Sequence, residues 1–216
     1  VDTTSILDGF TITGGNANTD YPYNVGGGLH IHTGSPKVIN CTFTRNWASN
    51  GGSGAWITSS DSALSNCSFI DNYSNYYAGA FYAYSGCLGS LENCTFIGNT
   101  AANNGGAVRI RASTFSVNNC TFTSNVSQTG GGGIVIAESA YATVNMSTFT
   151  NNRGIGRGGA IFVDSSSEAI VQRCNFVGNA APHGGAIRCS DAQSITIHNC
   201  IFKKNGSNWG ITCFNG

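Results

Sequence analysis

The sequence predicts an all-β fold: a right-handed parallel β-helix, or solenoid, of about eight rungs, with 26–27 residues and three strands per rung. Three periodic features lead to this prediction. A Phe-x-x-Asn motif, a small-residue pair followed by an apolar residue, and a short apolar strand that usually ends in cysteine all recur with the same period. So tight a period is typical of a solenoid, in which each repeat buries its core against its neighbours.

The Phe-x-x-Asn motif marks one strand and the turn after it. Two-residue alternation places Cys41 and Phe43 inward and Thr42 and Thr44 outward. We expect the phenylalanines to stack in the core and the asparagines to form a hydrogen-bonded ladder along the axis. The motif ends at Asn46, Asn72, Asn99, Asn125, Asn152, Asn179 and Asn205, at intervals of 26 or 27 residues.

The small-residue pair begins a second strand, in which Leu29 and Ile31 point inward and His30 and His32 outward. This strand gives two outward columns, expected to contain His30, Ile57, Tyr82, Arg109, Val135, Phe162 and Arg188, and His32, Ser59, Tyr84, Arg111, Ala137, Asp164 and Ser190. Tyr82, Tyr84, Arg109 and Arg111 form a candidate surface-binding patch, because tyrosine rings and guanidinium groups can hold a sugar or a carboxylate. The alternative is ordinary cross-strand packing.

Composition agrees with a stacked β fold. Only 9% of residues are charged, against roughly 25% in ordinary domains. A charge repeated in every rung would lie about 4.8 Å from its like. The net charge is zero and no apolar run reaches roughly 18 residues, so neither a nucleic-acid partner nor membrane insertion is expected.

The GGA[ILV] and FxxN pair, with the opening "LDGFTITGGNA", resembles the repeats of chlamydial polymorphic outer membrane proteins and related bacterial surface proteins. The resemblance covers essentially the whole chain. It implies a secreted, parallel β-helical adhesin or surface scaffold.

Six of the nine cysteines share one predicted column, in which Ser147 fills one place. Neighbouring rungs lie about 4.8 Å apart, inside the roughly 4.4–6.8 Å Cα separation of disulfides. Alternatively, the thiols are reduced and serve as small apolar core groups. One cysteine per rung does not match a CxxC metal motif, so no metal or cofactor is expected. The candidate disulfides are Cys41–Cys67, Cys94–Cys120, Cys174–Cys200 and Cys189–Cys213, which leaves Cys87 unpaired.

The ten acidic residues do not suggest a catalytic site. A glycoside hydrolase needs two carboxylates about 5–10 Å apart, and no two acids share an outward column on adjacent rungs. The nearest pair, Asp164 and Glu168, is separated by a predicted turn. We therefore expect no catalytic residues, although a polysaccharide-cleaving or carbohydrate-binding β-helix is the alternative function.

The strand before each ladder asparagine presents a Thr-x-Thr face that resembles those of ice-binding solenoids. The alternative explanation is that threonine is common in strands for structural reasons. Its candidate residues are Thr42, Thr44, Thr95, Thr121, Thr123, Thr148 and Thr150. Eight Asn-x-Ser/Thr sequons also occur. Asn72, Asn125 and Asn205 are the candidate glycosylation sites, whereas the Asn-Cys-Thr sequons are expected in a buried turn.

Together these features predict a single β-helix domain over residues 1–216 without evident caps, either a processed chain or part of a longer one. We expect a non-enzymatic, extracellular or cell-surface structural or adhesive module. The two ends of the sequence together spell about one repeat, so its expected partners are neighbouring solenoid repeats or copies stacked head to tail.

Overall fold

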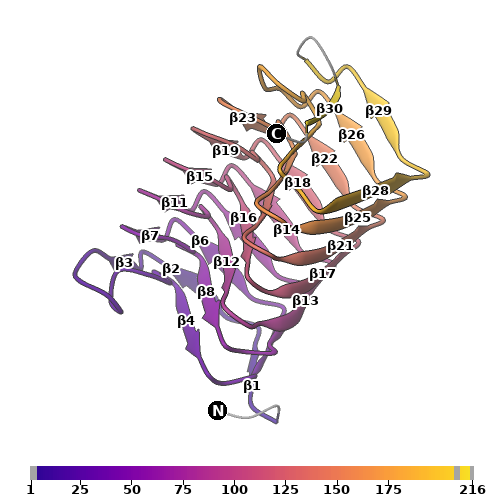
Figure 1. Cartoon of the computed structure of the whole chain (residues 1–216). Helices are drawn as coiled ribbons and strands as arrows, with labels where there is room; N and C mark the ends of the chain where they lie inside the picture. The colour runs from indigo at the N-terminus through magenta and orange to yellow at the C-terminus, as the bar shows by residue number, and fades with distance from the viewer. Residues whose placement is uncertain (1–3, 207–209, 215–216) are drawn as a thin grey trace.

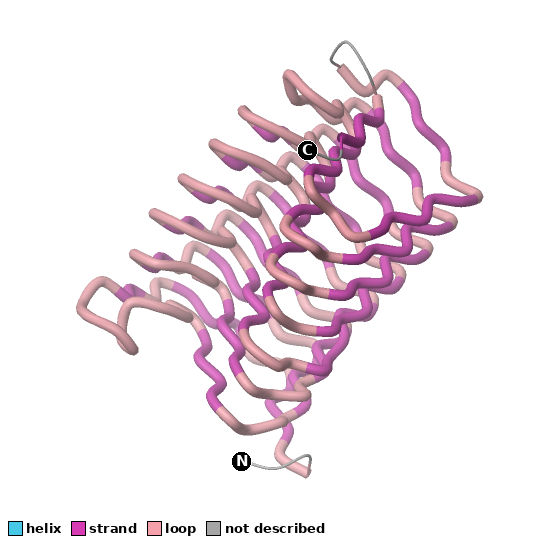
Figure 2. Tube along the Cα trace, viewed as in Figure 1, coloured by secondary structure: helices cyan, strands magenta, loops and turns pink. Residues whose placement is uncertain are grey.

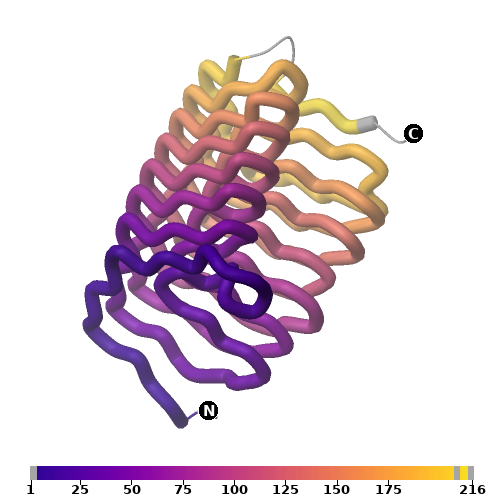
Figure 3. The backbone as a smooth tube through the Cα atoms, turned by 90° about the vertical axis from the view of Figure 1, so that its left-hand side faces the viewer, coloured from indigo at the N-terminus to yellow at the C-terminus, as the bar shows by residue number. Residues whose placement is uncertain are grey.

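The computed structural model describes residues 4–206 and 210–214, which form a parallel β-solenoid (Figure 1). Successive turns of the chain lie side by side along one axis, from the indigo N-terminal end to the yellow C-terminal end (Figure 3). Each turn adds one strand to each of the sheets that it passes through, and every strand pairing is parallel. The predicted all-β solenoid is therefore confirmed.

Three sheets contain eight strands each. Sheet 1 contains β1 (Ile6–Asp8), β5 (Lys37–Ile39), β9 (Ala63–Ser65), β13 (Leu88–Glu92), β17 (Thr114–Asn118), β21 (Tyr141–Asn145), β25 (Glu168–Gln172) and β28 (Ser194–His198). Sheet 2 contains β2 (Thr11–Thr13), β6 (Thr42–Thr44), β10 (Ser68–Ile70), β14 (Thr95–Ile97), β18 (Thr121–Thr123), β22 (Thr148–Thr150), β26 (Asn175–Val177) and β29 (Ile201–Lys203). Sheet 4 contains β4 (Leu29–His32), β8 (Ala55–Thr58), β12 (Phe81–Tyr84), β16 (Val108–Arg111), β20 (Ile134–Ala137), β24 (Ile161–Asp164), β27 (Ile187–Ser190) and β30 (Ile211–Phe214).

A fourth sheet, which the sequence did not predict, lies between sheets 2 and 4 in chain order. Sheet 3 contains the two-residue strands β3 (Asn16–Ala17), β7 (Trp47–Ala48), β11 (Tyr73–Ser74), β15 (Thr100–Ala101), β19 (Val126–Ser127) and β23 (Arg153–Gly154). Most rungs therefore have four strands rather than three. Turns separate these strands at the corners of each rung (Figure 2).

The asparagine ladder is confirmed. The Asn72 amide nitrogen donates to the Phe43 carbonyl and to the Asn99 side-chain oxygen, both at 3.0 Å. The same pattern continues from Asn46 to Asn205. Each side-chain oxygen also accepts a hydrogen bond from a backbone nitrogen of the buried turn in the neighbouring rung, as Asn99 does from Asn72.

The phenylalanines of sheet 2 form a continuous stack in the core. From Phe43 to Phe202, successive ring centroids lie 4.7–4.9 Å apart, with interplanar angles of 4–10°. The small-residue pair is required by close backbone approach. A Cβ at Gly106, for example, would lie 2.2 Å from the Gly132 carbonyl oxygen.

The corner between sheets 1 and 2 carries a second asparagine column, formed by Asn40, Asn66, Asn93 and Asn119. Their φ angles lie between 51° and 53°, in the left-handed region that asparagine tolerates. All four residues are exposed. The expectation that the Asn-Cys-Thr sequons lie in a buried turn is therefore wrong.

The register of sheet 4 corrects the predicted outward columns. Trp56 pairs with His30 and Tyr82, whereas Ile57 is fully buried in the core. Thr58, not Ser59, continues the second column. The Gly-Ala-Trp sequence resembles the small-residue pair and its apolar residue, but Ala55, not Trp56, occupies the inward position opposite Leu29.

Candidate ligand-binding site

An aromatic pocket lies on the outer face of sheet 4, near the N-terminal end of the described chain. Its volume is about 410 Å³. The loop between β3 and β4, which projects from the side of the solenoid (Figure 1), contributes Tyr21. The lining residues are Tyr21, Asn50, Trp56, Tyr77, Tyr82, Tyr84 and Arg111.

Three strands position the floor of this pocket. The in-register pairing of β8, β12 and β16 stacks Trp56, Tyr82 and Arg109 in one column. The Trp56 and Tyr82 ring centroids are 4.3 Å apart in an edge-to-face arrangement, which is a favourable aromatic geometry. Tyr77, in the turn before β12, packs its ring 6.0 Å from that of Tyr82.

Two arginines and one glutamate form a charged cluster beside the pocket, and of the three only Arg111 lines it. The Arg109 guanidinium lies 4.1 Å from the centre of the Tyr77 ring, and that of Arg111 lies 5.0 Å from the Tyr84 ring. Both arginines also bind Glu138, Arg109 at 3.2 Å and Arg111 more closely. The cations are thus held against the rings by a carboxylate outside the pocket lining.

Several buried polar atoms around the pocket have no hydrogen-bond partner in the described part of the chain. They include Nε1 of Trp56 and the hydroxyl of Tyr82, residues that are 4% and 1% exposed. Arg111 lies near the Tyr82 hydroxyl without a hydrogen bond of good geometry. Burial raises the pKa of Tyr82, so its hydroxyl stays protonated at neutral pH. Unpartnered buried donors cost free energy unless a ligand or water satisfies them.

The structure brings the four predicted patch residues together, but with different roles. Tyr84 and Arg111 are partly exposed and line the pocket. Tyr82 and Arg109 are 1% and 4% exposed, so they support it from below. Trp56 was not among the predicted patch residues. Equal spacing identifies it, because Leu29, Ala55 and Phe81 follow one another at intervals of 26 residues and Trp56 follows Ala55.

Tyr77 and Glu138 were also missed. Both lie in turns, where two-residue alternation carries no information about side-chain direction. They reach the patch only because turns of successive rungs stack beside sheet 4.

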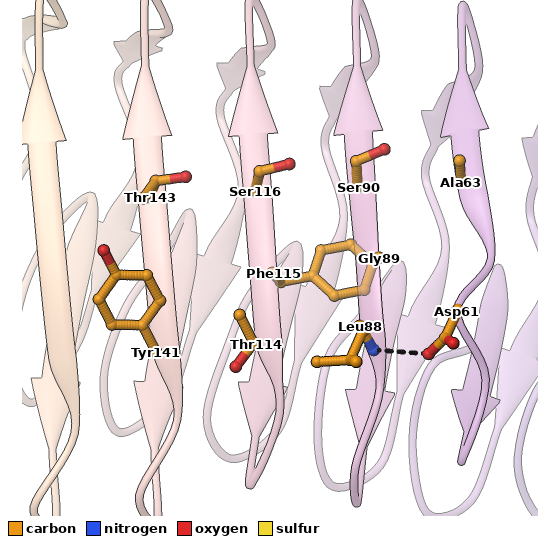
Figure 4. Close-up of a pocket in the computed structure, with 10 residues that line it drawn as sticks. All are labelled: Asp61, Ala63, Leu88, Gly89, Ser90, Thr114, Phe115, Ser116, Tyr141 and Thr143. Carbon is orange, nitrogen blue, oxygen red and sulfur yellow. Dashed lines mark hydrogen bonds between the residues drawn. The ribbon is translucent and has the colours of Figure 1, made fainter.

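A second hollow lies on the outer face of sheet 1 and has a volume of about 370 Å³ (Figure 4). Figure 4 shows Ser90, Ser116 and Thr143 in one row across the strands. Its carboxylate, Asp61, accepts a hydrogen bond from the backbone nitrogen of Leu88 at 3.1 Å. The lining contains no cation and one tyrosine, so this hollow lacks the cation and the packed tyrosine and tryptophan rings of the aromatic pocket.

The six column cysteines lie in one column of the solenoid, as predicted. All nine thiols are free in the structure. The column thiols donate to backbone carbonyls: Cys94, for example, donates to Leu64 and Glu92 at 3.5 and 3.3 Å. Cys87 is likewise buried and donates to Ile57 and Tyr84. Whether any of the candidate pairs oxidises stays a prediction.

The predicted Thr-x-Thr residues do share the outer face of sheet 2. In-register pairing aligns Thr121 with Thr95 and Thr148, and Thr123 with Thr150. Thr11 and Thr13 extend both columns toward the N-terminus. Two isoleucines, Ile70 and Ile97, interrupt the second column.

Two of the three candidate glycosylation sites, Asn72 and Asn125, are wrong for the folded chain, and the third, Asn205, stays a prediction. Asn72 and Asn125 are at most 1% exposed, and their amides are committed to the ladder. Asn205 is partly buried and donates to the Phe176 carbonyl at 3.0 Å. Ser207, which completes its sequon, lies outside the described residues.

Within residues 4–206 and 210–214, no group of three or more His, Cys, Asp or Glu side chains is arranged to hold a metal ion. The same residues contain no helix of the length and apolarity needed to cross a membrane.

The periodic ladders, parallel sheets and stacked core define the class of protein: a parallel β-solenoid with a pocket on its flank. The family described as "right-handed beta helix region" matches residues 8–156 and, in a second overlapping match, residues 100–216. The chain belongs to this family. No curated protein and no solved structure matches it significantly.

Proposed function

We propose that the chain is a non-enzymatic, extracellular adhesive module that binds carbohydrate in the aromatic pocket of sheet 4. The observation that carries this proposal is the pair of unpartnered buried groups, Trp56 Nε1 and Tyr82 hydroxyl, beside packed aromatic rings. The resemblance to bacterial surface repeats supports the extracellular and adhesive part.

Carbohydrate fits this pocket chemically. A sugar ring presents apolar C–H faces, which suit aromatic side chains, and a rim of hydroxyls, which suits fixed donors. Tyr84 and Arg111 are partly exposed at the opening, whereas Trp56 is held in the floor. A mostly aromatic cavity with a few fixed polar groups is the usual form of a small-molecule site.

The arrangement favours binding over hydrolysis. No acid lines the pocket, and the nearby Glu138 is paired with two arginines. Hydrolysis of a glycosidic bond needs a proton donor and a second carboxylate across the bond.

A glycan array followed by titration calorimetry tests the proposal. Tyr84→Ala should weaken binding of a positive glycan at least about tenfold, because it removes the ring beside Arg111. Tyr141→Ala is the matched control, since it removes a partly exposed tyrosine from the sheet 1 hollow. An unchanged affinity in Tyr84→Ala, or a loss only in Tyr141→Ala, would place binding elsewhere, and an array without any binder would remove the proposal.

Two further functions stay predictions. Head-to-tail association of copies rests on the repeated rung and is tested by electron microscopy, where dispersed monomers at high concentration would count against it. Ice binding rests on the aligned threonines of sheet 2. An ice-recrystallisation assay tests it, and no inhibition at high protein concentration would rule out ice binding.

A further inference from the structure

The last described rung contains a cysteine pair that differs from the rest. β27 and β30 pair in register, so Cys189 lies directly opposite Cys213. Their sulfur atoms are 2.6 Å apart. Non-bonded atoms of this size rest well beyond 3 Å, since even two carbons prefer about 3.5–4.0 Å. The arrangement therefore accommodates a covalent bond better than two separate thiols.

The surroundings of the two thiols also favour a covalent bond between them. The six column thiols are each hydrogen-bonded to backbone carbonyls, as for Cys120 with Leu91 and Asn118. In residues 4–206 and 210–214, neither Cys189 nor Cys213 has such a carbonyl partner, and each sulfur contacts the other. Oxidation of this pair would therefore break no backbone hydrogen bond, whereas oxidation of a column pair would.

Access also separates this pair from the column. Cys213 is exposed, whereas Cys189 is 3% exposed behind it. Five of the six column thiols are at most 1% exposed, and the sixth, Cys200, is half-buried but keeps two backbone carbonyl partners. A soluble oxidant can therefore reach Cys213 directly, and Cys189 only through Cys213.

We propose that Cys189 and Cys213 form an oxidative cross-link site that takes a low-molecular-weight disulfide, such as oxidised glutathione, as its co-substrate. The Cys213 thiolate attacks one sulfur of that disulfide, forming a mixed disulfide and releasing one thiol. The Cys189 thiolate then attacks the Cys213 sulfur and releases the second thiol. Two protein thiols are oxidised, one small disulfide is reduced, and the two protein protons end on the released thiols.

The cross-link fixes an edge strand. β30 is the last described strand of sheet 4, and the described residues place a strand, β27, on one side of it only. Close to the pair, Ala186 and Ile187 donate hydrogen bonds to the Gly210 carbonyl. An edge strand held only by such bonds opens more readily than an interior strand, and the disulfide would prevent this opening.

Thiol counting by mass spectrometry tests the proposal. The folded chain is incubated with oxidised glutathione, quenched in acid, unfolded and alkylated. We expect two of the nine thiols to be lost, so that seven are alkylated, with a peptide that joins Cys189 to Cys213. The amide hydrogens of β30 should also exchange more slowly after oxidation.

Three variants make the result specific. Cys189→Ser should stop at a glutathione adduct on Cys213, and Cys213→Ser should not react, because Cys189 is buried. Cys120→Ser, which copies the serine that Ser147 already places in the column, should still lose two thiols. The proposal is overturned if all nine thiols survive excess oxidised glutathione, if the joined peptide contains column cysteines, or if Cys213→Ser still loses two.

Discussion

At the scale of single residues, the ladder asparagines illustrate how one side chain serves two rungs. Asn125 accepts hydrogen bonds from the backbone and side-chain nitrogens of Asn99, and it donates to the Phe96 carbonyl and to Asn152. No other residue type offers a donor and an acceptor at this length. The side chain therefore completes hydrogen bonding at a turn where backbone groups would otherwise be buried and unpaired.

Asn125→Ala should destabilise the fold strongly. The change leaves the Asn99 backbone nitrogen buried without a partner, at about 1–3 kcal/mol, and it removes the side-chain hydrogen bonds to the Phe96 carbonyl and to Asn152, at about 1 kcal/mol each. We expect the free energy of unfolding to fall by about 4 kcal/mol, measured by urea denaturation.

Asn119→Gly is the matched control for that substitution. Asn119 belongs to the exposed corner column and has a φ of 51°, and its side chain donates to the exposed Asn93 side chain. Glycine adopts this φ readily, so we expect a change within about 1 kcal/mol. Equal losses in the two variants would contradict the distinction between the buried ladder and the exposed corner.

At the scale of elements, the phenylalanine stack of sheet 2 is continuous, but its members differ in their neighbours. Phe122 is fully buried, with Phe96 and Phe149 stacked on its two sides at 4.7 Å. Phe202 is partly buried, and Phe176 is the ring that the described residues stack on it. The same truncation should therefore have different consequences at the two positions.

Phe122→Ala should lower the free energy of unfolding by about 4 kcal/mol, because it leaves a cavity between two rings. Phe202→Ala should cost about 2 kcal/mol, since one side of its ring lacks a described neighbour. Urea denaturation of both variants measures the difference. A larger loss for Phe202→Ala would show that stability is not concentrated in the middle of the stack.

Element length and spacing explain which parts of the fold could be predicted. The strands of sheets 1, 2 and 4 have at least three residues and carry recognisable alternation, so they were found from the sequence. Strands such as β7 (Trp47–Ala48) are too short to show any alternation. Trp56 was assigned to the wrong face because a local motif was preferred over equal spacing. The two asparagine columns look alike in sequence, and only the backbone direction at each turn separates the buried one from the exposed one.

At the scale of the whole molecule, the stacked thiols tie stability to pH. Hydrogen bonding with Cys120, together with burial, raises the pKa of Cys94 to about 12, and burial raises that of Cys174 to about 12. The ordinary thiol pKa is 9.0. Below that value both folded and unfolded chains keep these protons, and the stability contribution is complete. Between about 9 and 12 only the unfolded chain releases them, so stability falls as pH rises.

The reduced chain should therefore lose stability in alkali, in part through these two thiols. Each contributes a loss of about 2 kcal/mol between pH 9.0 and pH 10.5, at about 1.4 kcal/mol per pH unit. The double variant Cys94→Ser/Cys174→Ser cannot release these protons, and Ser147 shows that the column accepts serine, whose hydroxyl donates to the Asn145 carbonyl. Urea denaturation at pH 8 and pH 10.5 with reductant present should show a decrease about 4 kcal/mol smaller for the variant. Equal decreases in the two chains would show that the buried thiols do not set the alkaline limit of the fold.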